Sequence, residues 1–237
     1  VLDVTSPFSG EVVGRVVADD AVTIAAALRA ARRAWQEFRR STPFERKTLL
    51  FALADKLAGE AEPMAQLISA EVGKTIAEAR NEVRRAQNTL RLSAEAAIVL
   101  HGEVLPCAVV AGAPDKVAQV SWQPAGVVGA ITPFNYPLNL LCHKLGPAIA
   151  AGNAVVAKPS PKAPLAAARL AELAEEAGFP EGLFSVVHGG AEAAPGLFLR
   201  WTSLIAGSLR PLQRSSRSGT PRPGGSSRGS CGRCRRS

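Results

Sequence analysis

Polar side chains follow two short apolar stretches in the middle of the chain. Thr132 and Asn135 come directly after the stretch Val127–Ile131, and Lys158 closes the stretch Ala154–Lys158. In open parallel sheets, ligands bind outside the carboxyl ends of the strands. The stem of a lysine at such a position can be covered while its ammonium reaches a ligand. If the two stretches are parallel strands, these side chains mark a ligand site.

The elements around these residues form a repeating strand–helix–strand pattern. A turn at Thr132–Pro137, a helix at Pro137–Ala150 and a Gly-Asn turn join the two stretches. Both stretches are apolar without alternation, which is typical of parallel strands that are covered on both faces. A helix at Leu165–Ala177 and a third strand at Leu183–Val187 continue the pattern. The sequence therefore predicts an α/β fold with a parallel sheet and right-handed crossovers.

Helical patterns fill most of the N-terminal part, after two short strands within residues 3–17. A helix starting near Asp19 or Asp20 places apolar side chains on one face, at Ile24, Leu28, Ala31, Trp35 and Phe38. Its other face is basic and is either a phosphate-contacting or a solvated surface, at Arg29, Arg32, Arg33, Arg39 and Arg40. Further helices are expected from Thr42 to Gly59 and from about Glu62 to Glu71.

The run Gly73-Lys74-Thr75 has the form of a phosphate-binding loop. That motif requires a glycine five residues before its Gly-Lys pair, where this chain has Ile68. Thr75 and Glu78 have the spacing of a capping box instead, so they are predicted to open a long helix that ends near Leu100.

Charge and cysteines are distributed unevenly along the chain. The net charge is +8, but nine arginines lie between Arg200 and Arg236, and no acidic residue follows Glu192. The remaining 19 basic residues nearly balance the 20 acidic ones. This near-neutral body gives no reason to expect a nucleic acid or membrane partner. The two scattered cysteines of the body favour a reducing compartment, and the expected location is the cytoplasm.

The stretch from Thr132 to Ser160 resembles the cofactor-domain signature of the aldehyde dehydrogenase superfamily. The family pattern T-P-[WF]-N-[FY]-P followed by K-L-x-P-A-L-x-x-G-N-x-V-V-x-K-P matches TPFNYP and KLGPAIAAGNAVVAKPS densely and in order. The run from Glu71 to Thr75 also resembles the join between two N-terminal helices of that family. The resemblance covers residues 1–193, about the first two-fifths of a full-length family member. It implies a partial Rossmann-like parallel sheet of the aldehyde dehydrogenase type.

The resemblance implies oxidation of an aldehyde with NAD or NADP as hydride acceptor. In the family a cysteine thiolate attacks the aldehyde, and a preorganised donor stabilises the resulting oxyanion. By likeness that donor is Asn135, although an asparagine can also simply shape a proline-rich turn. Lys144 matches a lysine that the family links to proton relay, and its other interpretation is a helix-surface lysine.

The same likeness assigns cofactor contacts. Lys158 corresponds to a lysine that contacts the adenosine ribose, and the neighbouring backbone lines the same cleft, at Ile131, Thr132, Pro133 and Phe134. Ser160 lies where the family accommodates or excludes a 2′-phosphate. Many NAD-preferring members have a glutamate where this chain has Pro161, and Lys162 favours tolerance of NADP, so the choice of cofactor stays open. Gly190 either allows close approach of the pyrophosphate or belongs to a plain turn.

The family's nucleophile and base segments are not recognisable in this sequence. The nucleophile lies in a G-Q-x-C segment and the glutamate in an E-L-G-G segment, and neither occurs here. Cys142 is expected to be a buried small hydrophobe in its helix. Cys231 and Cys234 have zinc-like spacing without a second pair, so no metal site is predicted. We therefore expect no dehydrogenase turnover from this chain.

The sequence divides into residues 1–194, a partial cofactor-binding domain, and residues 195–237, an Arg-, Ser-, Gly- and Pro-rich tail that is expected to be disordered. The abrupt change is what a shifted reading frame produces, which sequencing of the encoding DNA tests. A strand around residues 116–124 resembles the family's oligomerisation arm, so a homo-oligomer is expected. Two alternatives remain: a non-enzymatic module whose tail binds nucleic acid or another polyanion without specificity, and a subunit that assembles with full-length dehydrogenase.

Overall fold

The computed structural model describes residues 1–107 and 117–190. These residues all belong to a single compact unit, Val1–Ala206. The boundary predicted near residue 194 and the whole predicted tail lie outside the described residues, so that division of the chain stays a prediction. None of the described helices is long and apolar enough to cross a membrane.

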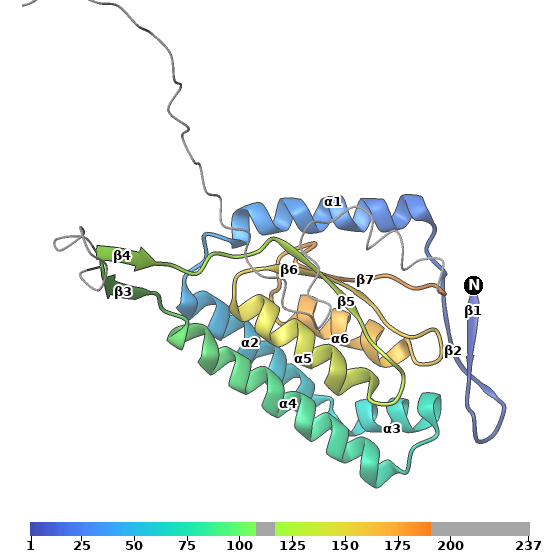
Figure 1. Cartoon of the computed structure of the whole chain (residues 1–237). Coiled ribbons are helices and arrows are strands. Elements are labelled where there is room, and N and C mark those ends of the chain that lie inside the picture. The colour runs from blue at the N-terminus through green and yellow to red at the C-terminus, as the bar shows by residue number, and fades with distance from the viewer. Residues whose placement is uncertain (108–116, 191–237) are drawn as a thin grey trace, which may run out of the picture. The chain divides into compact units, whose positions relative to one another are not determined.

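A parallel three-stranded sheet forms the centre of the described part of the chain (Figure 1). Its order is β5 (Val127–Ile131), β6 (Ala154–Lys158) and β7 (Phe184–Val186). Helix α5 (Pro137–Ala150) connects β5 to β6, and α6 (Leu165–Glu176) connects β6 to β7. Every residue of β6 is buried, as the unbroken apolar run predicts. The α/β prediction is confirmed.

Helices cover both faces of the sheet. Helix α1 (Ala21–Phe38) lies along one face, and α5 and α6 lie on the other (Figure 1). The cap of α1 is Asp20, whose carboxylate accepts a hydrogen bond from the backbone N–H of Thr23 at 2.8 Å. The apolar face predicted for this helix is buried, except for Trp35, which is only partly buried. The five arginines predicted for the other face are exposed, but Arg39 and Arg40 follow the last residue of the helix.

Three further helices complete this side of the sheet: α2 (Pro43–Gly59), α3 (Ala61–Val72) and α4 (Ile76–Val99). Helices α2 and α4 pack against α5, and α3 packs against α4 and α6. Both predicted capping boxes are present, at the first turns of α2 and α4. Thr75 accepts from the backbone N–H of Glu78, and Gly73 ends α3 with a positive φ of 75°. The Gly-Lys-Thr run therefore joins two helices and forms no phosphate loop.

Helices α4 and α5 approach each other closely where Gly146 faces Ser93. A methyl group built on Gly146 would lie 2.5 Å from the Ser93 hydroxyl oxygen and 2.9 Å from its Cβ. Only a residue without a side chain allows this spacing. Glycine at this position thus allows the close approach of the two helices.

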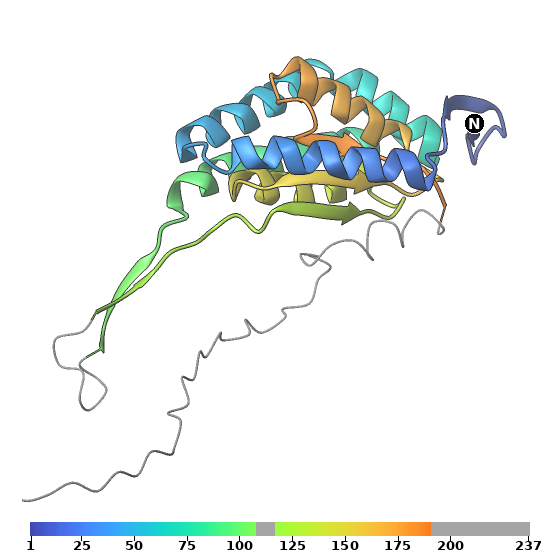
Figure 2. The same cartoon turned by 90° about the horizontal axis from the view of Figure 1, so that it is seen from above.

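Two antiparallel hairpins complete the described residues. Strands β1 (Leu2–Thr5) and β2 (Val12–Val16) pair as predicted, and β3 (Glu103–Pro106) pairs with β4 (Val117–Val120). Strand β3 was not predicted, since the sequence marks only the end of the long helix near Leu100. The strand expected around residues 116–124 is present as β4, and all of its residues are exposed. Figure 2 shows this hairpin extending past the ends of the helices.

Candidate functional site

The carboxyl ends of β5 and β6 bring the predicted site residues together. The parallel register pairs Ile131 with Lys158, and the backbone N–H of Thr132 donates to the carbonyl of Lys158 at 3.2 Å. The turn Thr132–Asn135 and the loop Lys158–Ser160 therefore leave the sheet side by side. This adjacency is what a ligand cleft at the edge of an open α/β sheet requires.

Lys158 connects two loops at this edge. Its side chain is buried, and its ammonium donates to the carbonyl oxygens of Pro159 at 3.1 Å and Gly189 at 2.9 Å. The expectation that its stem is covered is confirmed. The ammonium lies against the loop that follows β7, next to Gly190. A single cation thus holds together the loops from β6 and β7.

Two buried polar atoms at the same edge have no hydrogen-bond partner among the described residues. They are the hydroxyl oxygen of Thr132 and Nδ1 of His188. Burial lowers the pKa of His188, and the charge of Lys158 lowers it further, while Asp19 opposes both effects. Because buried polar groups are normally hydrogen-bonded, these two atoms are exceptions at this edge of the sheet.

Sequence reasoning assigned no role to His188. Its backbone is tied to the start of α1, because its N–H donates to the Asp19 carboxylate at 2.6 Å and its carbonyl accepts from the Asp19 N–H at 2.9 Å. Its position in the sequence could have pointed to it, because His188 is the first titratable side chain after the third strand.

Asn135 is exposed, and its two neighbours in the chain are aromatic residues whose rings each face a lysine. The ammonium of Lys162 is 5.1 Å from the centre of the Phe134 ring, and that of Lys74 is 3.9 Å from the centre of the Tyr136 ring. A cation over an aromatic face is attracted by its quadrupole. The two lysines come from different loops, so the turn that carries Asn135 is held on both sides.

Two buried glutamates cap the helices that follow β5 and β6. Glu82 accepts from the backbone N–H groups of Leu138 at 3.0 Å and Asn139 at 3.1 Å. Glu71 accepts from those of Leu165 at 2.8 Å and Ala166 at 3.1 Å. Neither α5 nor α6 has a cap from its own N-cap side chain.

These caps limit where an anionic ligand can bind. A free helix N-terminus is a ready anion site, but here a carboxylate already occupies the first turn of each crossover helix. A phosphate could bind at either place only by displacing a buried glutamate. Sequence reasoning missed both roles, because each acceptor and its donors lie far apart in the chain.

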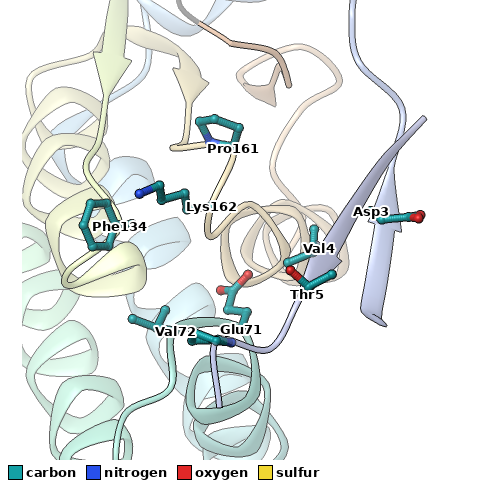
Figure 3. Close-up of a pocket in the computed structure, with 9 residues that line it drawn as sticks. Asp3, Val4, Thr5, Glu71, Val72, Phe134, Pro161 and Lys162 are labelled. Atoms are coloured by element: carbon teal, nitrogen blue, oxygen red, sulfur yellow. The ribbon is translucent and has the colours of Figure 1, made fainter. Parts of the chain in front are cut away.

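A cavity of about 460 Å³ lies between the N-terminal hairpin and this edge (Figure 3). Its lining includes one predicted site residue, Phe134, together with Asp3, Val4, Thr5, Pro7, Glu71, Val72, Pro161 and Lys162. In Figure 3 the side chain of Lys162 extends toward Phe134. Burial raises the pKa of Glu71 to about 7, against the opposing effect of its two backbone hydrogen bonds.

Helix α5 carries two other candidate residues. Cys142 is fully buried in the hydrophobic core, and burial raises the pKa of its thiol, with the charge of Glu82 adding to the effect. The expectation that it is a buried hydrophobe is confirmed. Lys144 is half-buried, and its proton-relay role stays a prediction.

Within residues 1–107 and 117–190, no group of three potential metal ligands occurs, and Cys231 and Cys234 lie outside those ranges.

The parallel sheet, the helices on both faces and the polar turns at the carboxyl edge define the class of open α/β proteins. A profile of the aldehyde dehydrogenase family matches residues 1–199. The chain belongs to this family.

Individual relatives agree with that assignment. The chain is 51% identical to 3-sulfolactaldehyde dehydrogenase of Priestia aryabhattai over 152 residues, which are 64% of this chain and 32% of that protein. NADP-dependent glyceraldehyde-3-phosphate dehydrogenase of Bacillus halodurans, solved with NADP, has a TM-score of 0.80 and 35% identity, over 83% of this chain and 42% of that chain. Betaine aldehyde dehydrogenase of Staphylococcus aureus, solved with NAD+, has a TM-score of 0.75 and 33% identity, over 80% and 38%. The chain thus spans about a third to two-fifths of the length of these relatives.

Proposed function

We propose that this chain is the cofactor-binding portion of an NAD(P)-dependent aldehyde dehydrogenase. The observation that carries the proposal is the pairing of Ile131 with Lys158, which brings the Asn135 turn and the buried lysine to one edge of the sheet. The hydroxyl of Thr132, which follows β5, is buried and has no hydrogen-bond partner among the described residues, and this supports a polar ligand at this edge. Residues 1–194 are the proposed cofactor-binding portion.

The proposed cofactor is NAD or NADP, as in the two solved relatives. Lys158 binds the adenosine ribose, with the backbone of Ile131–Phe134 lining the cleft and Gly190 beside it. When bound, the nicotinamide supplies the hydride acceptor of the reaction. Ser160 and Lys162 lie where the 2′-phosphate of NADP would bind. Because position 161 is a proline and not an acidic residue, no negative charge there repels that phosphate.

Asn135 is the proposed oxyanion donor. It is exposed on the turn that follows β5, where the rings on either side of it in the chain each face a lysine, and a preorganised amide N–H is the kind of group that stabilises developing negative charge. Lys144 is the proposed proton-relay residue on the following helix. The substrate class is an aldehyde; the names of the relatives include several different aldehydes, so no single one is favoured.

No turnover is proposed for the chain by itself. The sequence contains no G-Q-x-C or E-L-G-G segment, and Cys142 is buried too deeply to attack a substrate. The exposed hairpin of β3 and β4 is the proposed surface for assembly with another subunit, because its apolar side chains, including Val104 and Val117, are uncovered among the described residues.

Calorimetric titration of NAD+ and NADP+ into the purified chain tests this function. Saturable binding of either dinucleotide at one site per chain is expected, without reduction of the cofactor when a panel of aldehydes is added. No binding at millimolar cofactor would contradict the proposed site. Production of reduced cofactor with any aldehyde would contradict the proposed inactivity.

A further inference from the structure

The first turn of α5 depends on a residue that is distant in the sequence. The residue at its N-cap, Tyr136, makes no capping hydrogen bond with its side chain, and Pro137 has no N–H to donate. The next two N–H groups donate to one oxygen of the Glu82 carboxylate, which comes from α4 and is 1% exposed. A carboxylate at a helix N-terminus also complements the helix dipole.

Lys74 connects this cap to the aromatic side chain beside Asn135. Its ammonium pairs with the other oxygen of Glu82 and also faces the Tyr136 ring, 3.9 Å from the ring centre. The pair is largely buried, since the Lys74 side chain is 13% exposed and that of Glu82 is fully buried. A buried charge that loses its partner is strongly destabilised, so each residue needs the other.

The loop that contains Lys74 is itself held in place. The Ser69 hydroxyl donates to the carbonyl of Lys74 at 2.7 Å, and Thr75 caps the helix that follows. The ammonium therefore reaches Tyr136 from a fixed backbone. At the other end of the turn, the N–H of Thr132 is bonded to β6.

From this geometry we propose that Glu82 and Lys74 are positioning residues for Asn135. The Glu82 carboxylate fixes the helix that begins two residues after Asn135, and the Lys74 ammonium fixes the ring next to it. Neither side chain touches a reacting atom; both act through the backbone and ring on which the amide of Asn135 is carried. The inference rests on the oxyanion role proposed for Asn135, for which tenths of an ångström in donor placement matter.

The single tyrosine of the chain provides a direct signal for the test. The protein is prepared with 3-fluorotyrosine, so that its one fluorine resonance reports the surroundings of Tyr136. Amide hydrogen exchange is measured in parallel at Leu138 and Asn139, with the second half of α5, residues 145–149, as an internal reference. The variants are Lys74→Met, Lys74→Arg and Glu82→Gln, with Arg80→Met as control, since Arg80 pairs with Glu62 on the exposed side of α4.

Lys74→Met is expected to shift the fluorine resonance of Tyr136. Glu82→Gln is expected to speed hydrogen exchange at both capped amides about tenfold, because a neutral acceptor replaces a charged one. Exchange in residues 145–149 stays unchanged in these variants. Lys74→Arg retains the protection of the capped amides, because arginine also pairs with carboxylates and stacks on rings. Arg80→Met changes neither signal.

Unchanged signals in both Lys74→Met and Glu82→Gln would overturn the inference. A uniform rise in exchange throughout α5 would also overturn it, because it would show a role in stability alone. If Glu82→Gln does not fold, the fluorine signal and capped-amide exchange of Lys74→Met and Lys74→Arg decide the question. Neither readout needs a cofactor, so failure of the calorimetric titration would contradict the proposed function and leave this test intact.

Discussion

The carboxylate of Glu71 caps a helix that begins ninety-four residues later in the chain, by accepting the backbone N–H of Leu165 at 2.8 Å. Glu71 is 2% exposed, and it lies in the last turn of α3, on the wall of the cavity shown in Figure 3. Helix α6 follows directly on the loop that leaves β6 after Lys158. A side chain from the N-terminal helices thereby supports the loop that carries the proposed cofactor residues.

The stability of the fold should depend on the protonation of Glu71. Its folded pKa of about 7 lies above the ordinary value of 4.5. The folded state therefore binds the proton more tightly, so the free energy of unfolding rises as the pH falls from 7 toward 4.5. Linkage gives a contribution of about 3 kcal/mol over that interval. Urea unfolding of wild type and Glu71→Gln across this range measures it.

In Glu71→Gln the side chain at position 71 no longer titrates. The difference in unfolding free energy between wild type and Glu71→Gln should therefore change by about 3 kcal/mol between pH 7 and 4.5. Glu62→Gln is the matched control, because Glu62 lies on the same helix with an exposed side chain. A pH-independent difference between wild type and Glu71→Gln would contradict the elevated pKa.

Cys142 should resist alkylation in the folded protein. Its thiol is fully buried and its pKa is raised by burial, so thiolate forms only when the helix opens. Half-buried Cys107 provides the internal comparison. Treatment with iodoacetamide, followed by peptide mass spectrometry, should show Cys142 reacting at least about a hundredfold more slowly. Equal rates in native buffer would contradict the burial, and equal rates in urea are expected.

Local patterns predicted the elements that carry the site. The bounds of β5, β6 and α5 agree with the ranges read from the sequence, because each strand is a continuous apolar run and Pro137 and a Gly-Asn turn mark the helix ends. The capping boxes at Thr42 and Thr75 are equally local. Such signals depend only on residues a few positions apart.

The residues that hold the site in place from other helices could not be predicted from local sequence patterns. Glu82 acts on amides more than fifty residues later, and an isolated glutamate in a helix gives no local sign of that partner. The Gly-Lys-Thr run was examined only as a phosphate loop or a capping box, so the contact of Lys74 with Tyr136 was missed. Strand β3 was missed because exposed residues lack the apolar alternation that marks a covered strand.

Substitution of Gly146 should weaken the packing of α4 against α5. In Gly146→Ala the added methyl group meets the Ser93 side chain at 2.5 Å, and overpacking of this kind costs about 1–3 kcal/mol, offset in part by about 1 kcal/mol of helix propensity. Thermal unfolding should therefore show a lower midpoint. Gly59→Ala is the control, since nothing lies within 4 Å of its added methyl group.

The effect of Gly146→Ala should shrink in a Ser93→Gly background, where the clashing side chain is gone. A cost of Gly146→Ala that is the same in both backgrounds would show that the two residues do not interact.

Removal of the charge at Lys158 should weaken cofactor binding. The proposed ribose contact uses the buried ammonium, which also holds the loops from β6 and β7 through Pro159 and Gly189. Lys158→Met keeps the apolar stem but loses these donors, and a lost charged hydrogen bond raises the dissociation constant by about tenfold or more. Calorimetry with NAD+ and NADP+ measures the loss, and circular dichroism checks that the fold persists. Lys56→Met, at an exposed surface ion pair, should bind like wild type. Equal affinity of Lys158→Met and wild type would place the ribose elsewhere on this edge of the sheet.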